Sequence, residues 1–176
     1  IVELVGPPLA TWMPDLTRSM VCAMIRHLGI RPDDSIIDFG CARGYAVRAL
    51  VELGYLAFGI DLSRWAIDNC DPTVTHRVYC NSRIKPGLTV NWVIAKDVLE
   101  HIPAISDIID NLMGAVSNGL LAIVPLSAVD GEQYVVNDYE KDVTHVHRLT
   151  LGSWVSMFVR PGWTVEASYR IRGVKD

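Results

Sequence analysis

The run SIIDFGCARG, residues 35–44, constrains the fold more than any other part of the sequence. A short apolar segment leads to Asp38, a loop of small residues follows, and residues 45–51 place apolar side chains at helical spacing. We predict a strand over residues 35–39, a tight loop, and a helix over residues 44–53. A loop of this kind brings backbone N–H groups and a helix N-terminus beside a nucleoside-bearing ligand.

A second acidic residue follows at the end of the next apolar run. Residues 56–60 form that run, and Asp61 comes 23 residues after Asp38. A carboxylate at the end of a neighbouring strand can accept hydrogen bonds from both hydroxyls of a ribose. The two aspartates therefore predict a nucleoside site at one edge of a sheet.

Strand and helix patterns alternate along the rest of the chain. The alternation predicts an α/β fold with a doubly wound, mostly parallel sheet and right-handed crossovers. The predicted elements are a helix from Leu16 to Leu28 ending at Gly29, a helix capped by Ser63 that continues to about Cys70, strands over residues 74–80, 92–95 and 120–124, a helix over residues 105–116 closed by Asn118-Gly119, a helix containing Trp154, and a strand over residues 163–172.

Size and composition limit the class of protein. The 176 residues, half of them hydrophobic, suit a single domain over residues 1–176 with one buried core. No apolar run reaches the roughly 18 residues of a membrane-spanning helix, and no signal-peptide pattern is visible, so we expect a soluble, cytoplasmic protein. Because the sequence begins with Ile1, it is compatible with a trimmed chain or a fragment.

The charge pattern bears on the kind of partner. The net charge is −4, and the 16 basic residues are scattered along the chain. A nucleic-acid footprint needs clustered Lys and Arg to neutralise phosphates. We therefore expect a small-molecule acceptor rather than a nucleic acid.

The two acidic motifs resemble the first two motifs of the class I S-adenosylmethionine-dependent methyltransferases. Residues 91–102 resemble the fourth-strand segment of that superfamily, and residues 158–163 resemble its late helix-to-strand turn. The resemblance covers about residues 16–170 and departs from the family at Ala42, where a second glycine is usual. It implies a Rossmann-like methyltransferase fold, with the last strand missing or the sheet edge simplified. It also implies methyl transfer from S-adenosylmethionine, with S-adenosylhomocysteine as product.

The resemblance also implies which residues hold the cofactor. Small residues in the loop let the backbone approach the amino-acid tail, and Asp38 adds negative charge near the cationic groups. Asp61 would bind the ribose, and Leu62 would lie against the adenine. The predicted cofactor set is Asp38, Gly40, Cys41, Ala42, Gly44, Asp61, Leu62, Asn81, Ser82, Lys96 and Asp97.

Three histidines are the predicted catalytic residues: His145, His147 and His101. Methyl transfer needs a general base only if the acceptor is a hydroxyl or a similar protonated group, and histidine titrates near neutrality. We expect the long stretch 126–148, together with residues 7–15, to supply the acceptor wall and a lid.

Two other functions remain open from the sequence. A nucleotide-dependent oxidoreductase usually shows G-x-G-x-x-G, and positions 43 and 45 are Arg and Tyr here. The second alternative is a non-catalytic module that keeps the fold and the cofactor but only binds a partner.

A divalent metal is a further alternative. Asp97-x-x-Glu100-His101 with a distant histidine loosely resembles a metal arrangement in certain RNA and quinone-precursor O-methyltransferases of the superfamily. The same segment occurs widely in metal-free relatives. The sequence therefore favours a site without a metal.

Overall fold

The structure is a computed structural model, and it describes residues 11–126 and 142–166. The helices are α1 (Pro14–Leu28), α2 (Tyr45–Glu52), α3 (Arg64–Asp68), α4 (Ile105–Gly114) and α5 (Leu151–Phe158), with the short 3-10 helix η1 at Leu99–His101. The strands are β1 (Ser35–Phe39), β2 (Leu56–Asp61), β3 (Val78–Cys80), β4 (Val90–Lys96) and β5 (Val116–Ile123).

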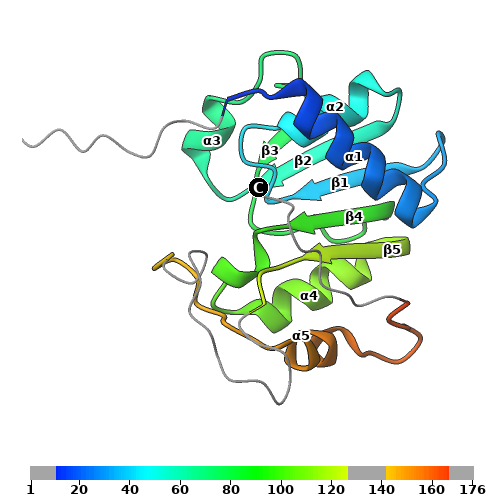
Figure 1. The fold of residues 1–176 in the computed structure, drawn as a ribbon, viewed down its shortest axis with the longest axis vertical. Coiled ribbons are helices and arrows are strands. Elements are labelled where there is room, and N and C mark those ends of the chain that lie inside the picture. The colour runs from blue at the N-terminus through cyan, green and yellow to red at the C-terminus, as the bar shows by residue number, and fades with distance from the viewer. Residues whose placement is uncertain (1–10, 127–141, 167–176) are drawn as a thin grey trace, which may run out of the picture.

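The strands of the described residues form one sheet in the order β3-β2-β1-β4-β5, and every neighbouring pair is parallel (Figure 1). The predicted doubly wound, parallel α/β fold is therefore confirmed. Because β1 lies between β2 and β4, the strand order reverses at β1. Open parallel sheets bind ligands outside the carboxyl ends of the strands at such a reversal.

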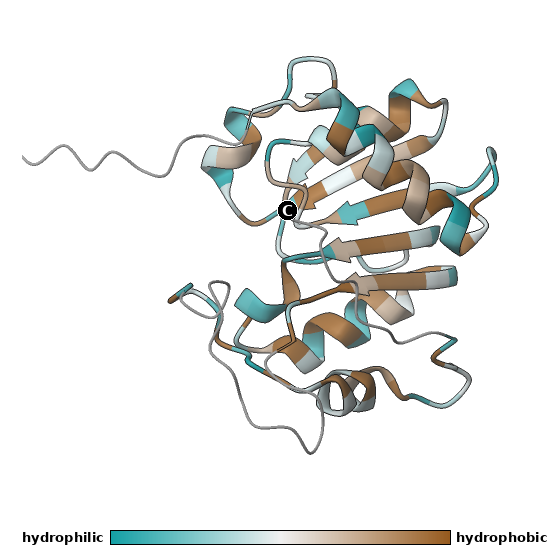
Figure 2. Cartoon of the chain, in the orientation of Figure 1, coloured by the Kyte–Doolittle hydropathy of each residue, from teal (hydrophilic) through white to brown (hydrophobic). Residues whose placement is uncertain are grey.

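Helices cover both faces of the sheet, and alternate residues of each strand serve two separate cores. Along β1, Ile36 packs with Val21 of α1 and Leu50 of α2. Its neighbour Ile37 lies in the other core, with residues of α4 and with Trp154 of α5. Figure 2 shows the resulting hydrophobic colour along the central strands. Burial on both faces is typical of parallel strands and fixes their register.

The first helix ends as the sequence predicts. Gly29 adopts a left-handed conformation with φ of 64°, and its N–H bonds the carbonyl of Ile25. A glycine suits this position because it has no Cβ to clash. The helix begins at Pro14 rather than at Leu16, and Leu16, which is 57% exposed, and His27 lie on its solvent side.

The third strand is shorter than the predicted span of residues 74–80, because β3 begins only at Val78. Asp71 closes a turn before it: its side chain accepts hydrogen bonds from the backbone N–H and the hydroxyl of Thr73. The Val74 N–H then bonds the Asp71 carbonyl at 3.0 Å. Val74 lies in this turn, and its side chain is buried in the core. Its apolar character therefore reflects core packing rather than a strand.

The boundary between α4 and β5 also differs from the prediction. The helix ends at Gly114 rather than at residue 116, and β5 already contains Asn118-Gly119. A Cβ built on Gly119 would lie 2.7 Å from the ring of Trp92, which packs across it from β4. The glycine therefore makes room for an aromatic ring on the neighbouring strand, although in sequence it resembles a turn.

Other predicted features lie wholly or partly outside the described residues. Most of the predicted lid, residues 127–141, and the end of the last predicted strand, residues 167–172, are outside them. The described part of that strand, residues 163–166, forms no strand. Among the helices that the structure describes, none has the length and apolar character needed to cross a membrane.

Candidate active site

The predicted cofactor residues converge at the carboxyl edge of the sheet. Asp38 lies at the end of β1, Asp61 ends β2, and Lys96 ends β4. The loop that follows β1 joins them, because the N–H groups of Gly40 and Cys41 both donate to the Ile60 carbonyl, at 2.8 and 3.1 Å. These backbone bonds hold the loop against β2.

Gly40 and Gly44 are required by their backbone conformations and by close packing. Their φ values are 81° and 76°, in the left-handed region. A Cβ on Gly40 would lie 2.5 Å from a methyl group of Val98, which follows β4. A Cβ on Gly44, the residue before α2, would meet Val74 and Val78 at 3.1 Å. A side chain at Gly40 would therefore force Val98 to move, and one at Gly44 would strain the backbone and crowd the two valines.

Asp61 fixes the rest of the loop. One carboxylate oxygen accepts the N–H of Ala42 at 2.7 Å, and the other accepts the N–H of Ser63 at 2.7 Å. A carboxylate offers about four lone-pair sites, so each oxygen keeps one free for a further donor. Ala42 itself has φ of 46°, which explains why a glycine is usual there. In this chain Ala42 adopts the left-handed conformation, and the residue is exposed.

Asp38 is a buried carboxyl group with a strongly shifted pKa. It is 7% exposed, and its pKa rises to about 7. The first cause is burial, the second is the charge of Asp61, and Lys96 opposes both. A cation brought to this edge would favour the ionised form of Asp38. Near pH 7 about half of the Asp38 side chains are therefore protonated without a ligand, and its role toward the cationic groups of the cofactor stays a prediction.

The thiol of Cys41 packs rather than reacts. Its side chain is buried, and burial raises the pKa of this thiol. A Cβ on Gly59 of β2 would lie 2.6 Å from the Cys41 sulfur, so the thiol fills the space left by that glycine.

The remaining predicted cofactor residues flank this edge. Leu62 is 74% exposed just after Asp61, and the N–H of Asn81 donates to the Asp61 carbonyl at 2.9 Å. Both Asn81 and Ser82 are exposed after β3. Lys96 forms an ion pair with Asp97. Their roles toward the adenine and the amino-acid tail stay predictions.

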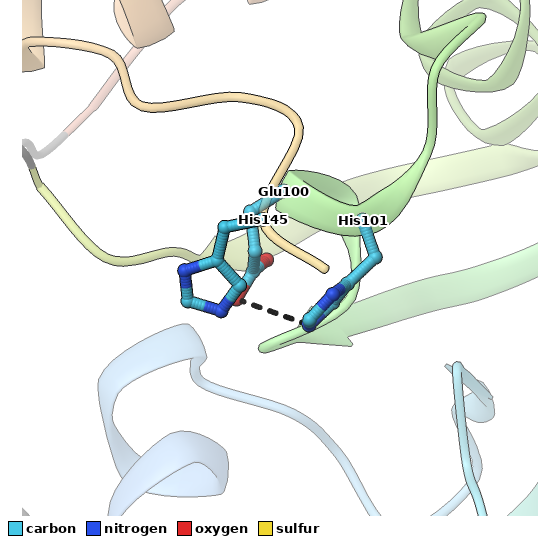
Figure 3. Close-up of side chains that lie close together, drawn as sticks. All are labelled: Glu100, His101 and His145. Atoms are coloured by element: carbon cyan, nitrogen blue, oxygen red, sulfur yellow. Dashed lines mark ion pairs between the residues drawn. The ribbon is translucent and has the colours of Figure 1, made fainter. Parts of the chain in front are cut away.

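Two of the three predicted catalytic histidines meet Glu100 in one cluster (Figure 3). Glu100 and His101 come from η1, and His145 comes from the segment that leads to α5. One ligating atom of each residue lies within 4.8 Å of the other two. Glu100 is 1% exposed and His145 is 8% exposed. Burial raises the pKa of the Glu100 carboxyl group, and the charge of Asp97 adds to this effect.

Backbone and side-chain contacts dock the His145 segment onto η1. The N–H groups of Val146 and His147 both donate to the Glu100 carbonyl, at 2.9 and 3.1 Å. Thr144 contacts His101 through its hydroxyl, 2.9 Å from Nδ1. Asp142 accepts the Thr144 hydroxyl at 2.6 Å, and these bonds lower the pKa of the Asp142 carboxyl group.

His147 stands apart from the cluster. Its Nε2 lies 2.9 Å from the Ile102 carbonyl, so Nε2 carries the proton and donates it. The ring also lies edge-on to Trp154, with centroids 6.3 Å apart. These contacts anchor the segment, and a catalytic role of His147 stays a prediction.

The pairing of Glu100 with His145 gave no local signal in the sequence. The two residues are 45 positions apart, and no fixed spacing links them. Sequence patterns also missed Thr144, which orients His101. An ST-type turn signal is visible in Asp142-Val143-Thr144, where the Asp142 side chain accepts the Thr144 N–H at 2.9 Å.

Most of the chain matches a known family of protein domains. The model described as "Methyltransferase domain" matches residues 16–168. The chain belongs to this family. Membership makes it a class I methyltransferase domain, and it implies S-adenosylmethionine as the methyl donor.

Solved structures of methyltransferases share the fold of this domain. The plantazolicin methyltransferase BpumL, in complex with a pentazolic desmethylPZN analog and SAH, has a TM-score of 0.60 at 16% identity, covering 85% of this chain and 63% of that one. Magnesium protoporphyrin IX methyltransferase from Synechocystis PCC 6803 with bound SAM has a TM-score of 0.53 at 20% identity, covering 68% and 66%. An S-adenosylmethionine-dependent methyltransferase from Clostridium acetobutylicum has 0.52 at 12%, covering 64% and 50%.

These likenesses concern the fold. The methyltransferase domain described here spans between half and two thirds of the length of those three proteins. A search of curated proteins found no match.

Proposed function

We propose that this chain transfers a methyl group from S-adenosylmethionine to a small-molecule acceptor, at an oxygen or a nitrogen atom. The observation that carries the proposal is the Asp61 carboxylate, held by two backbone N–H groups beside the glycine loop. Each of its oxygens keeps one lone-pair site, and a ribose presents two neighbouring hydroxyls. Family membership supplies the donor that carries such a ribose.

The charge of the site supports a cationic ligand without phosphates. The charge of Asp61 raises the pKa of Asp38, so the two carboxyl groups lie close together. A pyrophosphate would add two more negative charges beside them, whereas a sulfonium and an ammonium group would offset them. This favours S-adenosylmethionine over a nicotinamide dinucleotide.

The reaction is an in-line displacement at the methyl carbon. A lone pair of the acceptor forms the new bond to carbon, and the carbon–sulfur bond breaks with its electrons going to sulfur. The sulfonium thereby becomes the neutral thioether of S-adenosylhomocysteine. A hydroxyl acceptor also loses its proton. Orientation supplies much of the rate, since well-oriented reactants reach effective molarities of about 10⁵ M or more.

The residues nearest the end of β4 would act on the acceptor. Val98 packs against Gly40, and two residues later Glu100 and His101 begin the cluster with His145. We place the acceptor on this side of the edge, with His101 or His145 available to take its proton.

Calorimetry with the whole chain tests the cofactor half of the proposal. We expect S-adenosylmethionine and S-adenosylhomocysteine to bind with one ligand per chain, and NAD to give no heat. Absence of binding at millimolar ligand, or preference for NAD, would contradict the proposal. Methyl transfer is then measured with S-adenosylmethionine labelled in the methyl group, against a panel of phenols, amines and carboxylates. Cofactor binding without turnover across that panel would favour a binding module.

A further inference from the structure

The two faces of the strands β2 and β3 are covered unequally. On one face, α2 packs on β2, and α3 packs on both strands. Val78 of β3 points to that side, because a Cβ on Gly44, the residue before α2, would meet it at 3.1 Å. Side chains of a strand alternate between its two faces, so Arg77 and Tyr79 point to the other side. There Tyr79 is 51% exposed, and Leu56 of β2 is 46% exposed.

The connection from β3 to β4 explains why this side is exposed. Residues 81–89 join the two strands and contain no helix (Figure 1). A crossover between parallel strands usually takes a dozen or more residues and includes an α-helix that packs on the sheet. Here Ile84 fastens the connection to α4: its N–H donates to the Asn111 amide oxygen at 2.8 Å, and the Asn111 amide donates to its carbonyl at 3.0 Å. The connection therefore supplies no helix to cover β2 and β3.

Arg77 lies on the exposed side without an acidic partner. Its Nε is buried and has no hydrogen-bond partner among the described residues. None of the ion pairs in the described part of the chain includes it. Its guanidinium lies over the ring of Phe58 of β2, 5.6 Å from the centroid, so the two side chains share this face. A half-buried arginine is usually paired, and an unpaired buried donor calls for an explanation.

The chain around Arg77 is cationic, although the whole protein is acidic. Residues 72–90 contain no Asp or Glu, and residues 56–60 carry no charge. The basic side chains of residues 72–90 are His76, Arg77, Arg83 and Lys85, of which Arg83 pairs with Asp107 of α4 at 3.7 Å. The net charge of the protein is −4. An apolar surface with local positive charge complements a partner that carries carboxylates beside apolar side chains.

We propose that the surface formed by Leu56, Phe58, Arg77 and Tyr79 binds an acidic amphipathic helix of a partner protein. The apolar stripe of that helix packs on the three apolar side chains, and one of its carboxylates pairs with Arg77. A helix is the element that normally covers a parallel sheet on this side. A nucleic acid fits less well, because phosphates need a row of exposed cations, whereas Arg77 is half-buried among apolar groups. The proposal does not depend on methyl transfer.

Binding of synthetic peptides to the whole chain tests the proposal. The probe, called the Glu peptide, has about 15 residues, with Leu at every third or fourth position and Glu and Gln elsewhere. The Lys peptide has Lys in place of each Glu. We expect one Glu peptide per chain by calorimetry, bound at least tenfold tighter than the Lys peptide. In NMR spectra of the isotopically labelled chain, the Glu peptide should shift amide signals of β2 and β3.

Variants of the surface sharpen the test. Arg77→Gln removes the cation and should weaken binding of the Glu peptide at least tenfold, because a hydrogen bond to a charged group is lost. Tyr79→Ser removes an exposed ring and should also weaken binding. The matched control is Arg64→Gln, because Arg64 is an exposed arginine of α3, on the opposite side of the same strands, where it pairs with Asp68 at 3.9 Å. That variant should bind as the wild type does.

Three kinds of result would overturn the surface. One is no binding of the Glu peptide at millimolar concentration, or equal binding of the Lys peptide. Another is binding that both surface variants leave unchanged while circular dichroism shows them folded, or NMR shifts that lie outside β2 and β3. The last is a different occupant: a dimer in sedimentation that Tyr79→Ser disrupts would assign the surface to a second copy, and tighter binding of oligouridine would assign it to a nucleic acid.

Discussion

The cofactor edge and the Glu100 cluster lie at the same end of the sheet, but they are held in different ways. At the cofactor edge, backbone N–H groups fill half of the lone-pair sites of Asp61, and glycines allow the close path of the loop. In the cluster, side chains from segments more than 40 residues apart lie close together, and two of their buried polar atoms have no hydrogen-bond partner within residues 11–126 and 142–166.

The difference shows that the two regions depend on a ligand to different degrees. The cofactor edge is formed by local chain geometry and needs no ligand to satisfy its loop. Burying a polar atom without a hydrogen-bond partner costs free energy. The cofactor edge is therefore preorganised by its own backbone, whereas the cluster keeps two buried polar atoms whose hydrogen bonds are not made within the described residues.

The largest effect should come from filling the space at Gly40. Gly40→Ala combines a left-handed backbone, which costs about 1–2 kcal/mol, with a clash against Val98 worth about 1–3 kcal/mol. Gly54→Ala is the matched control, because Gly54 has φ of 90° and open space around its Cβ position. Urea unfolding should show a loss of about 3 kcal/mol for the first and about 1 kcal/mol for the second. Equal losses would mean that packing at the loop does not matter.

Asp38→Asn should remove the pH dependence contributed by the buried carboxyl group. The folded pKa of about 7 exceeds the ordinary value of 3.8, so the folded wild type keeps a proton that the unfolded chain has lost. Wild-type stability therefore falls as pH rises from about 4 to 7, by at most about 1.4 kcal/mol per pH unit. The variant lacks this loss. Urea unfolding at pH 5 and pH 7 should show that the free energy of unfolding of the variant, relative to that of the wild type, is higher at pH 7. The same difference at both pH values would contradict the shifted pKa.

Asp61→Asn should weaken cofactor binding at least tenfold. An amide has one acceptor oxygen, so its NH₂ group would face the N–H of either Ala42 or Ser63. Charged hydrogen bonds are worth about 1.5–3 kcal/mol each. Calorimetry with S-adenosylhomocysteine measures the change. Asp68→Asn, on the exposed face of α3, is the control and should bind as the wild type does. If the wild type and both variants bound S-adenosylhomocysteine with equal affinity, Asp61 would not be a cofactor-binding residue.

The smallest effect on stability should come from Thr144→Val in the cluster. Its side chain is exposed, and such substitutions change stability by about 0.5 kcal/mol or less. The His101 ring then loses its shorter contact at Nδ1, the 2.9 Å one, and keeps only the Thr144 carbonyl at 3.3 Å, so its tautomer should shift toward a mixture. Nitrogen NMR of the imidazole rings measures this directly, and Thr144→Ser should restore the wild-type spectrum. A single unchanged tautomer in Thr144→Val would show that Thr144 does not orient the ring.

Sequence patterns predicted the cofactor edge because its determinants are local. Asp38, Gly40 and Gly44 lie within one strand-loop-helix unit, and their spacing alone predicts a tight loop beside a ligand. The parallel α/β class followed from the alternation of strands and helices, whereas the strand order came only from the structure. The place of Asp61 after the next apolar run predicted the second half of the site, and the family resemblance added the identity of the ligand.

Tertiary packing explains what the sequence could not predict. Gly119 has the signal of a turn, but it lies in β5 because the Trp92 ring needs the space above it. Val74 is apolar without being in a strand, since a turn buries it beside Gly44. His145 meets Glu100 only because the segment before α5 docks on η1. Such contacts join residues far apart in sequence, where periodicity carries no information.

A crystal structure of the chain with S-adenosylhomocysteine is the most direct measurement of the central claim, that the carboxyl edge at β1 and β2 holds an adenosyl ligand. We predict ribose hydroxyls on the two oxygens of Asp61, and the thioether directed toward the end of β4. A ligand bound elsewhere, or an edge closed by side chains with Asp61 turned away, would contradict the claim.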